Sequence, residues 1–260
     1  GTAMAACKRM TRRLAVLVML LCVATAGSAQ AQPDPLDIIN MVQDLYRGDS
    51  SHGTATMEIV TEHWSREITI ESWSLGEDHS LIRILAPAKE AGSATLMADD
   101  DIWNYLPKVD RTIKLPAAMM GGSWMGSHFT NDDLIQESRL VDDYDIEMTF
   151  DGERDGTRVW EVTLVPKFDA AVVWGRIEYI IRQADGLPAS VLYYDEDGEL
   201  ARSMEWSEYE NIGGRMMPRL MNMRPADKPE ERTTFRYEEM EFDIDVDESF
   251  FSLRTLQSRR

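Results

Sequence analysis

A serine in a glycine-rich turn is the first candidate for chemistry in this chain. The run Gly121-Gly122-Ser123-Trp124-Met125 resembles the Gly-x-Ser-x-Gly turn that exposes the nucleophile of many hydrolases. That turn needs glycine at its last position, where this chain has Met125. An esterase that uses Ser123 or Ser127 is therefore the weakest functional interpretation. The sequence predicts no catalytic residues and no enzyme.

Residues that commonly bind metal ions are equally sparse. Histidines occur at four scattered positions, His52, His63, His79 and His128. No two of them have the spacing of zinc ligands. The run Asp195-Glu196-Asp197-Gly198 resembles the start of a calcium loop, but Trp206 occupies the twelfth position, where such a loop has glutamate. A hairpin turn is the simpler interpretation, and we expect no metal and no other cofactor.

Residues 1–31 have the three regions of a secretory signal peptide. Basic residues between Lys8 and Arg13 precede an apolar run over residues 14–26, and Ala29-Gln30-Ala31 suits cleavage before Gln32. The bulky Met19-Leu20-Leu21 before Cys22 argues against a lipid-anchored product. No later stretch is long and apolar enough to span a membrane. We therefore expect one domain over residues 32–260, exported to the periplasm of a Gram-negative cell.

Cysteine content and charge limit what the exported chain can do. Both cysteines, Cys7 and Cys22, precede the cleavage site, so we expect neither disulfides nor thiolate metal ligands after it. Without the four basic residues of the signal peptide, 23 Lys and Arg face 46 Asp and Glu, a formal charge of −23. Such a surface repels nucleic acid and anionic lipid headgroups. The negative charge is explained by a need for solubility. It also suits a shuttle protein that contacts membranes only transiently.

The hydrophobic pattern predicts one helix followed by many strands. Apolar residues from Leu36 to Tyr46 have helical spacing, and Arg47-Gly48 ends that helix. From Gly53 the period changes to two and recurs to residue 242, with turns such as Asp151-Gly152 and Gly213-Gly214 between the strands. The many strands predict a mainly β fold. Because about eleven or more strands are too many for a flat sheet, we expect the sheet to curl. It is a single curled antiparallel sheet, an incomplete, half-open β-barrel with an N-terminal helix.

One long connection, from Pro116 to Glu137, breaks the alternation. It is irregular up to Gly126 and predicts a short helix over 131–137, with Thr130 as its cap. Its apolar residues must cover an apolar surface. Either the connection is a plug that closes the open end of the barrel as ordinary core, or it is a movable lid over a ligand cavity, which adaptable methionine side chains favour.

These features together resemble a known family. They are the signal peptide, the helix that ends at Tyr46-Arg47-Gly48, the Trp103–Pro107 strand with Arg111 in its partner, and the run from Trp124 to Leu134. In this order they resemble the outer-membrane lipoprotein-sorting proteins of the LolA/LolB type, particularly their larger LolA-like branch. The resemblance implies an incomplete barrel covered by helices, whose concave apolar face holds acyl chains.

The resemblance also implies site residues, on which the chain departs in one respect. The expected cavity and lid residues are Met57, Ile59, Ile68, Ile70, Trp103, Tyr105, Met119, Met120, Trp124, Met125 and Phe129. Well-studied carriers have an arginine-proline motif followed by an aromatic pair, whose arginine holds the lid closed. Here three residues separate Arg83 from Pro87 and no aromatic pair follows. Arg83 or Arg111 is expected to hold the lid instead.

The main functional hypothesis is a periplasmic carrier that moves acylated lipoproteins or related lipids toward the outer membrane. Its partners would be that cargo, an inner-membrane transporter and an outer-membrane acceptor, with no nucleic acid. The alternative is a periplasmic sensor of the type that binds an anti-sigma factor, because that protein has a similar fold. Such a sensor has a further C-terminal domain, for which the sequence after Phe250-Phe251-Ser252-Leu253 leaves little room.

Overall fold

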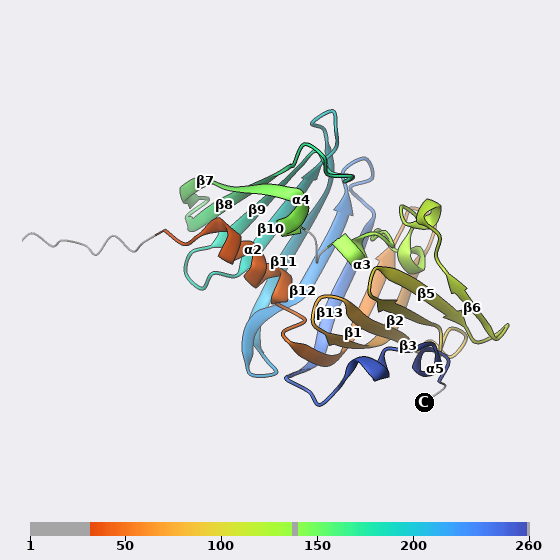
Figure 1. Cartoon of the computed structure of the whole chain (residues 1–260). Helices are drawn as coiled ribbons and strands as arrows, with labels where there is room; N and C mark the ends of the chain where they lie inside the picture. Colours follow the sequence, from red (N-terminus) through yellow and green to blue (C-terminus); the bar gives the residue numbers. More distant parts are fainter. Residues whose placement is uncertain (1–31, 137–139, 259–260) are drawn as a thin grey trace, which may run out of the picture. The chain divides into compact units, whose positions relative to one another are not determined.

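A computed structural model describes residues 32–136 and 140–258 of the chain (Figure 1). The predicted signal peptide and Glu137, the predicted end of the short helix, lie outside the described residues. Residues 34–258 belong to one compact unit. None of its helices is long and apolar enough to cross a membrane.

In the part of the chain that the structure describes, thirteen strands form one antiparallel sheet, as the period-two pattern predicts. Their bounds are β1 Ser50–Val60, β2 Ser65–Leu75, β3 His79–Ala86, β4 Ala94–Ala98, β5 Asp101–Leu106, β6 Arg111–Lys114, β7 Tyr144–Arg154, β8 Thr157–Pro166, β9 Arg176–Arg182, β10 Pro188–Tyr194, β11 Leu200–Ile212, β12 Arg215–Pro225 and β13 Arg232–Phe242. The spatial order is β6-β5-β4-β3-β2-β1-β13-β12-β11-β10-β9-β8-β7. Two meanders therefore join where the first strand pairs with the last, and β6 and β7 remain as the two edges of an open, curled sheet.

The register at the join places large apolar residues opposite one another. Met57 of β1 faces Phe235 of β13, and on the other side of β1 it faces Ile68 of β2. Alternate residues of these strands are buried, because successive side chains point to opposite faces of a strand. We call the face that carries Met57, Ile68 and Phe235 the inner face.

Within the described residues, seven short helical segments accompany the sheet. They are α2 Pro35–Asp44, α3 Asp133–Gln136, α4 Leu140–Asp143, α5 Leu253–Leu256, and the 3-10 turns η1 Ala117–Met119, η2 Trp124–Gly126 and η3 Glu248–Phe250. Asp34 caps α2 by accepting a hydrogen bond from the backbone N–H of Leu36, and Ile38, Ile39 and Val42 are buried. α2 contacts β7 and α4, and belongs to the main core of the inner face.

The outer face carries a second, smaller core over the β2–β5 half of the sheet. Phe251 and Leu256, from the segment that ends the described chain, pack there against Leu81, Leu96 and Tyr105. Strand β3 is thus buried on both faces: Leu81 lies in the outer core, whereas Ile84 lies in the inner one. Figure 1 shows α5 beside β3, away from α2.

Candidate ligand cavity and its lid

The strand order explains why one connection crosses the inner face. β6 and β7 are consecutive in sequence, yet they form opposite edges of the thirteen-stranded sheet. The chain between Lys114 and Tyr144 must therefore travel from one edge to the other. Its apolar side chains meet β13, which lies near the middle of the sheet. We call residues 116–136 the lid segment.

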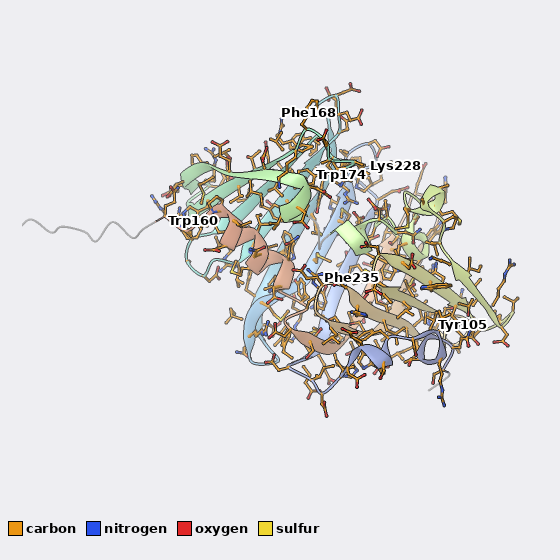
Figure 2. All side chains as sticks on the ribbon, in the orientation of Figure 1. Tyr105, Trp160, Phe168, Trp174, Lys228 and Phe235 are labelled. Carbon is orange, nitrogen blue, oxygen red and sulfur yellow. The ribbon has the colours of Figure 1, made fainter. Side chains whose placement is uncertain are left out.

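Aromatic contacts seat the lid segment on the inner face. The indole of Trp124 lies nearly parallel to the ring of Phe235, with ring centroids 6.3 Å apart, and Phe129 meets Phe235 edge-on at 5.4 Å. Trp124 is buried, and its indole N–H donates to Thr95 Oγ1 of β4 at 3.3 Å. The lid segment therefore contacts both meanders. Figure 2 shows Phe235 between Tyr105 on one side and Trp174 on the other.

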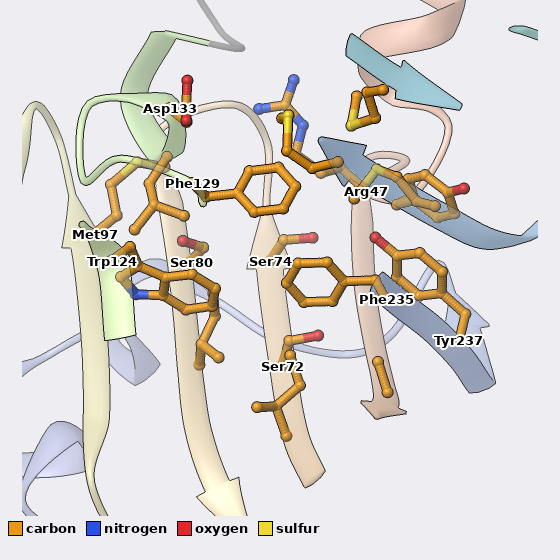
Figure 3. Close-up of a pocket in the computed structure, with 18 of the residues that line it drawn as sticks. Arg47, Ser72, Ser74, Ser80, Met97, Trp124, Phe129, Asp133, Phe235 and Tyr237 are labelled. Carbon is orange, nitrogen blue, oxygen red and sulfur yellow. The ribbon is translucent and has the colours of Figure 1, made fainter. Parts of the chain in front are cut away.

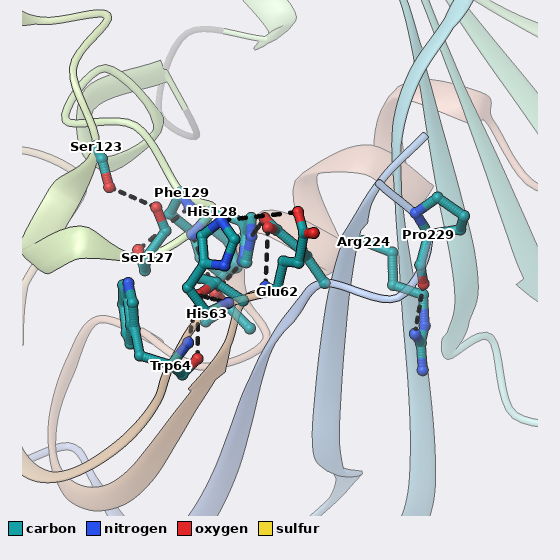
Figure 4. Close-up of polar contacts among 12 residues, drawn as sticks. Glu62, His63, Trp64, Ser123, Ser127, His128, Phe129, Arg224 and Pro229 are labelled. Atoms are coloured by element: carbon teal, nitrogen blue, oxygen red, sulfur yellow. Dashed lines mark hydrogen bonds and ion pairs between the residues drawn. The ribbon is translucent and has the colours of Figure 1, made fainter. Parts of the chain in front are cut away.

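A buried polar cluster anchors the middle of the lid segment (Figure 4). The backbone N–H of His128 donates to Thr233 Oγ1 at 3.0 Å, and the His128 ring lies 2.8 Å from that hydroxyl and 3.0 Å from Glu231 Oε2. Glu231 also accepts from the backbone N–H of Glu62, between β1 and β2. The hydrogen bond to His128 and that from Glu62 lower the pKa of Glu231 below its ordinary value.

Arg66 anchors the same stretch from β2. Its guanidinium donates to the carbonyl of Met125 at 2.9 Å and forms an ion pair with Glu90. Met125 has a left-handed backbone, with φ of 52°, which an L side chain adopts only when its surroundings hold it. The contact with Arg66 is one such restraint.

A paired arginine holds the end of the lid segment to the far meander. Asp133, the first residue of α3, accepts two hydrogen bonds from Arg202 of β11, at 2.7 and 2.8 Å. Thr130 and Asp133 also bond each other's backbone N–H groups, as in a capping box. The predicted short helix is present from Asp133 to Gln136, two residues later than its predicted start, and Thr130 accepts a hydrogen bond from the N–H of its first residue. The ion pair between Arg202 and Asp133 thus joins the lid segment to the sheet by two charge-assisted hydrogen bonds.

A cavity of about 220 Å³ lies beneath the lid segment (Figure 3). Its apolar wall comes from both meanders and the lid and includes Ile70, Ile82, Met97, Trp124, Phe129, Leu134, Met204, Met221, Met223 and Phe235. Its polar wall includes Arg47, Ser51, Ser72, Ser74, Ser80, Asp133 and Arg202. The cavity is therefore amphipathic. Four serines on β1, β2 and β3 supply hydroxyl groups beside the apolar surface.

Of the eleven apolar residues predicted for the site, three line this cavity: Ile70, Trp124 and Phe129. Met57, Ile59 and Ile68 share the inner face but are fully packed in the main core. The period-two pattern correctly predicted their face. It could not show which inner-face positions the chain itself would cover.

The other predicted residues lie elsewhere. Trp103 and Tyr105 belong to the outer core, because the C-terminal segment covers that face of β5. Met119 is exposed, Met120 packs near Met97 in a small cluster of its own, and Met125 packs against the main core. None of these five lines the cavity.

Neither arginine proposed as the lid holder contacts the lid segment in the described interactions. Arg83 is buried on the outer face, where it donates to the carbonyl of Thr255 at 2.6 Å and lies over the ring of Trp73. Arg111 is exposed at the start of the edge strand β6. Arg202, 69 residues beyond Asp133, holds the lid segment instead. No spacing rule points to it, because the pairing depends on the strand order.

The candidate nucleophiles are engaged in backbone contacts. Ser123 donates to the carbonyl of Ser127, and Ser127 donates to that of Trp124 at 2.6 Å. Thr233, His128 and Glu231 are arranged in series like a hydrolase triad, but Thr233 has an exposed fraction of 0%. A substrate cannot reach a hydroxyl in that position. Within residues 32–136 and 140–258, no group of three or more His, Cys, Asp or Glu side chains is placed to hold a metal ion.

Comparisons with known proteins agree on the architecture. A LolA superfamily protein from Nitrosomonas europaea is 21% identical with a TM-score of 0.72, over 86% of this chain and 100% of that one. A putative outer membrane lipoprotein-sorting protein domain from Vibrio parahaemolyticus has the same identity and TM-score, over 86% and 98%. A DUF1329 family protein from Desulfovibrio piger is 22% identical with a TM-score of 0.74, over 86% and 100%. No curated protein matches the chain.

A family model described as that of an uncharacterized protein matches residues 76–258, from the turn before β3 to the end of the described chain. The match includes the lid segment, Arg202 and Asp133, and it omits α2, β1 and all of β2. Because it spans well over half of the chain, the chain belongs to this family, and its fold is an open curled barrel similar to that of the LolA superfamily protein, as the resemblance predicted.

Proposed function

We propose that this protein is a periplasmic carrier that binds the acyl chains of lipoproteins or related lipids beneath the lid segment and moves them toward the outer membrane. The observation that carries the proposal is the cavity beneath the lid segment, lined by Trp124 of the lid, Phe235 of β13 and residues of both meanders. A filled core would leave no such space. The fold supports the same role, because one protein of this fold is described as a lipoprotein-sorting domain.

Simple energetics explains why a carrier would need this cavity. Burying a methylene group stabilises it by about 0.8 kcal/mol, so one long acyl chain held in water costs about 10 kcal/mol. A wall of methionine, isoleucine and aromatic side chains recovers much of that free energy. Methionines also adapt to acyl chains of different shape.

In this proposal the lid segment moves when cargo binds. About 220 Å³ is below the roughly 300–1,000 Å³ of sites that enclose drug-sized ligands. Because the lid segment lines the cavity, its shift away from β13 would enlarge the space for a long acyl chain. Of the two sequence interpretations, plug and movable lid, the proposal takes the second. Binding and release require no covalent chemistry, and we propose no enzymatic activity.

The transport route is part of the proposal. Cargo would come from an inner-membrane transporter and leave to an outer-membrane acceptor. The formal charge of −23 after residue 31 opposes lasting adsorption to anionic membranes, which suits a carrier that contacts each membrane briefly.

Native mass spectrometry of the protein purified from its own periplasm tests the proposal. We expect co-purifying masses of acylated lipids or lipopeptides, which disappear in the Trp124→Asp variant. The exposed Trp64→Asp variant is the matched control, because Trp64 does not line the cavity. Protein without bound lipid, combined with no measurable affinity for acyl probes, would contradict the carrier function.

A further inference from the structure

The guanidinium of Arg202 binds the carboxylate of Asp133, a residue of the lid segment. The guanidinium presents Nη1 and Nη2 to the two oxygens of Asp133, at 2.8 and 2.7 Å. This is the two-point geometry with which arginine binds carboxylates and phosphates in general. Both residues line the cavity, so a ligand there would meet the same guanidinium.

The surroundings of Arg202 are built for a buried cation. Its exposed fraction is 6%, and the rings of Trp174 and Tyr193 lie over the guanidinium with centroids 4.5 and 4.4 Å from Cζ. Burial by itself lowers the pKa of Arg202, but the hydrogen bond and charge of Asp133 outweigh it and raise the pKa. Its Nε–H has no hydrogen-bond partner among the described atoms, which leaves one donor unused.

Opening of the lid segment would separate Arg202 from its counter-ion. α3, which carries Asp133, is only four residues long and belongs to the lid segment, whereas Arg202 is fixed in β11. When the lid segment moves, Asp133 leaves and Arg202 remains as a buried cation without its counter-ion. Removing one partner of a buried ion pair is strongly unfavourable. A neutral ligand does nothing to relieve this, whereas an anionic ligand does.

We propose that Arg202 binds the anionic group of the cargo, and that the carboxylate or phosphate of the ligand replaces Asp133 and thereby releases the lid segment. This inference rests on the proposed function and specifies its ligand class: an amphiphile with an apolar chain and a carboxylate or phosphate group. The chain lies against Trp124, Phe129 and Phe235, and the anion lies at Arg202. Ligand binding opens the lid because the ligand interacts differently with the two states.

Three ligands of one chain length test the inference: dodecanoate, dodecyl phosphate and the neutral dodecanol. Affinities come from displacement of N-phenylnaphthylamine, a neutral fluorescent probe. We expect each anion to bind roughly tenfold to a hundredfold more tightly than the alcohol, as for hydrogen bonds to a charged group. The ratio between the two anions then distinguishes a fatty-acid source from a phosphate-bearing lipid.

Two substitutions and one control variant show whether the preference for anions depends on Arg202. Arg202→Gln should abolish it, so that acid and alcohol bind equally. Arg182→Gln is the matched control, because Arg182 also pairs with an aspartate, Asp185 at 2.8 Å, and lies over an aromatic ring, Tyr209, but does not line the cavity. Asp133→Asn removes the internal competitor and keeps the cation, so the preference for anions should rise about tenfold.

Spin labels report the lid position. Residues 32–260 contain no cysteine, so Met119→Cys in the lid segment and Phe168→Cys between β8 and β9 give one label pair. Both positions are exposed (Phe168 is labelled in Figure 2). Dodecanoate should change the distance between the labels, and saturating dodecanol should change it much less.

The outcomes separate this inference from the proposed function. Equal affinity for acid and alcohol in the unaltered protein, or a preference that survives Arg202→Gln, would overturn the anion site while the carrier function stands. No binding of any of the three ligands would overturn both. If Arg202→Gln does not fold, Asp133→Asn decides, and an unchanged preference in that variant would overturn the inference.

Discussion

The indole ring of Trp124 and the ring of Phe235 lie within 13° of parallel, although one residue belongs to a connection and the other to the last strand. This contact places the lid segment over the line where β1 and β13 join the two meanders. The two rings also form part of one cavity wall. The contact between Trp124 and Phe235 therefore both covers the β1–β13 pairing and forms part of the cavity wall.

Replacement of Trp124 by aspartate should separate the lid from the sheet. A carboxylate in this buried position has lost both the indole contact with Phe235 and the hydrogen bond to Thr95, and it favours a solvated, open lid segment. We expect acyl-chain affinity to fall by roughly tenfold or more. The sheet should stay folded, as measured by far-UV circular dichroism, because no strand pairing involves Trp124. Unchanged affinity would refute the lid assignment.

Alanine substitutions of core and cavity residues on the inner face should lower stability alike and differ only in their effect on acyl-chain affinity. Ile59→Ala and Ile70→Ala each remove a buried side chain, so each should lower the free energy of unfolding by about 2–5 kcal/mol in denaturant titrations. Only Ile70 lines the cavity, so only Ile70→Ala should also weaken acyl-chain binding, by several-fold. Equal loss of affinity in both variants would place the ligand deeper in the sheet than the cavity.

Arg83 should stabilise the C-terminal segment and leave the lid segment unaffected. Arg83→Met removes the hydrogen bond to the Thr255 carbonyl, and we expect unfolding to become easier by about 1–3 kcal/mol. Hydrogen exchange should accelerate at the amides of Leu256 and Gln257, which close the turn of α5. Faster exchange in the lid segment instead would restore Arg83 as the lid holder.

Acid should weaken the anchor formed by Glu231 and His128. Because the folded protein lowers the pKa of Glu231 below its ordinary 4.5, ionised Glu231 stabilises the fold above that pH, and this contribution is lost as the pH falls through the folded pKa. Glu231→Gln should therefore reduce the thermal midpoint at pH 7. At a pH below the folded pKa, variant and parent should have similar midpoints, and a difference that persists there would contradict this assignment.

Much of the local structure follows from local patterns of residues. Alternation in segments such as 55–60 predicted strands, and Asp34-Pro35 followed by apolar residues at helical spacing matches α2, although this helix ends at Asp44 rather than near Tyr46. The same reasoning predicted one curled, open antiparallel sheet. Periodicity reports which face of an element is buried, because burial on one face repeats with the geometry of that element.

The site depended on contacts that no local pattern contains. Trp103 and Tyr105 alternate as inner-face residues would, yet the C-terminal segment buries them on the outer face. Arg202 carries no motif and pairs with Asp133 only because β11 lies beneath the path of the lid segment.

The sequence by itself determined the strands, the first helix and an apolar connection that had to cover something. Only the tertiary structure decided what that connection covers and which arginine holds it. The physical reason is range: side-chain alternation acts between neighbours along one strand, whereas the cavity arises from the order of strands across the sheet, where residues far apart in sequence become neighbours.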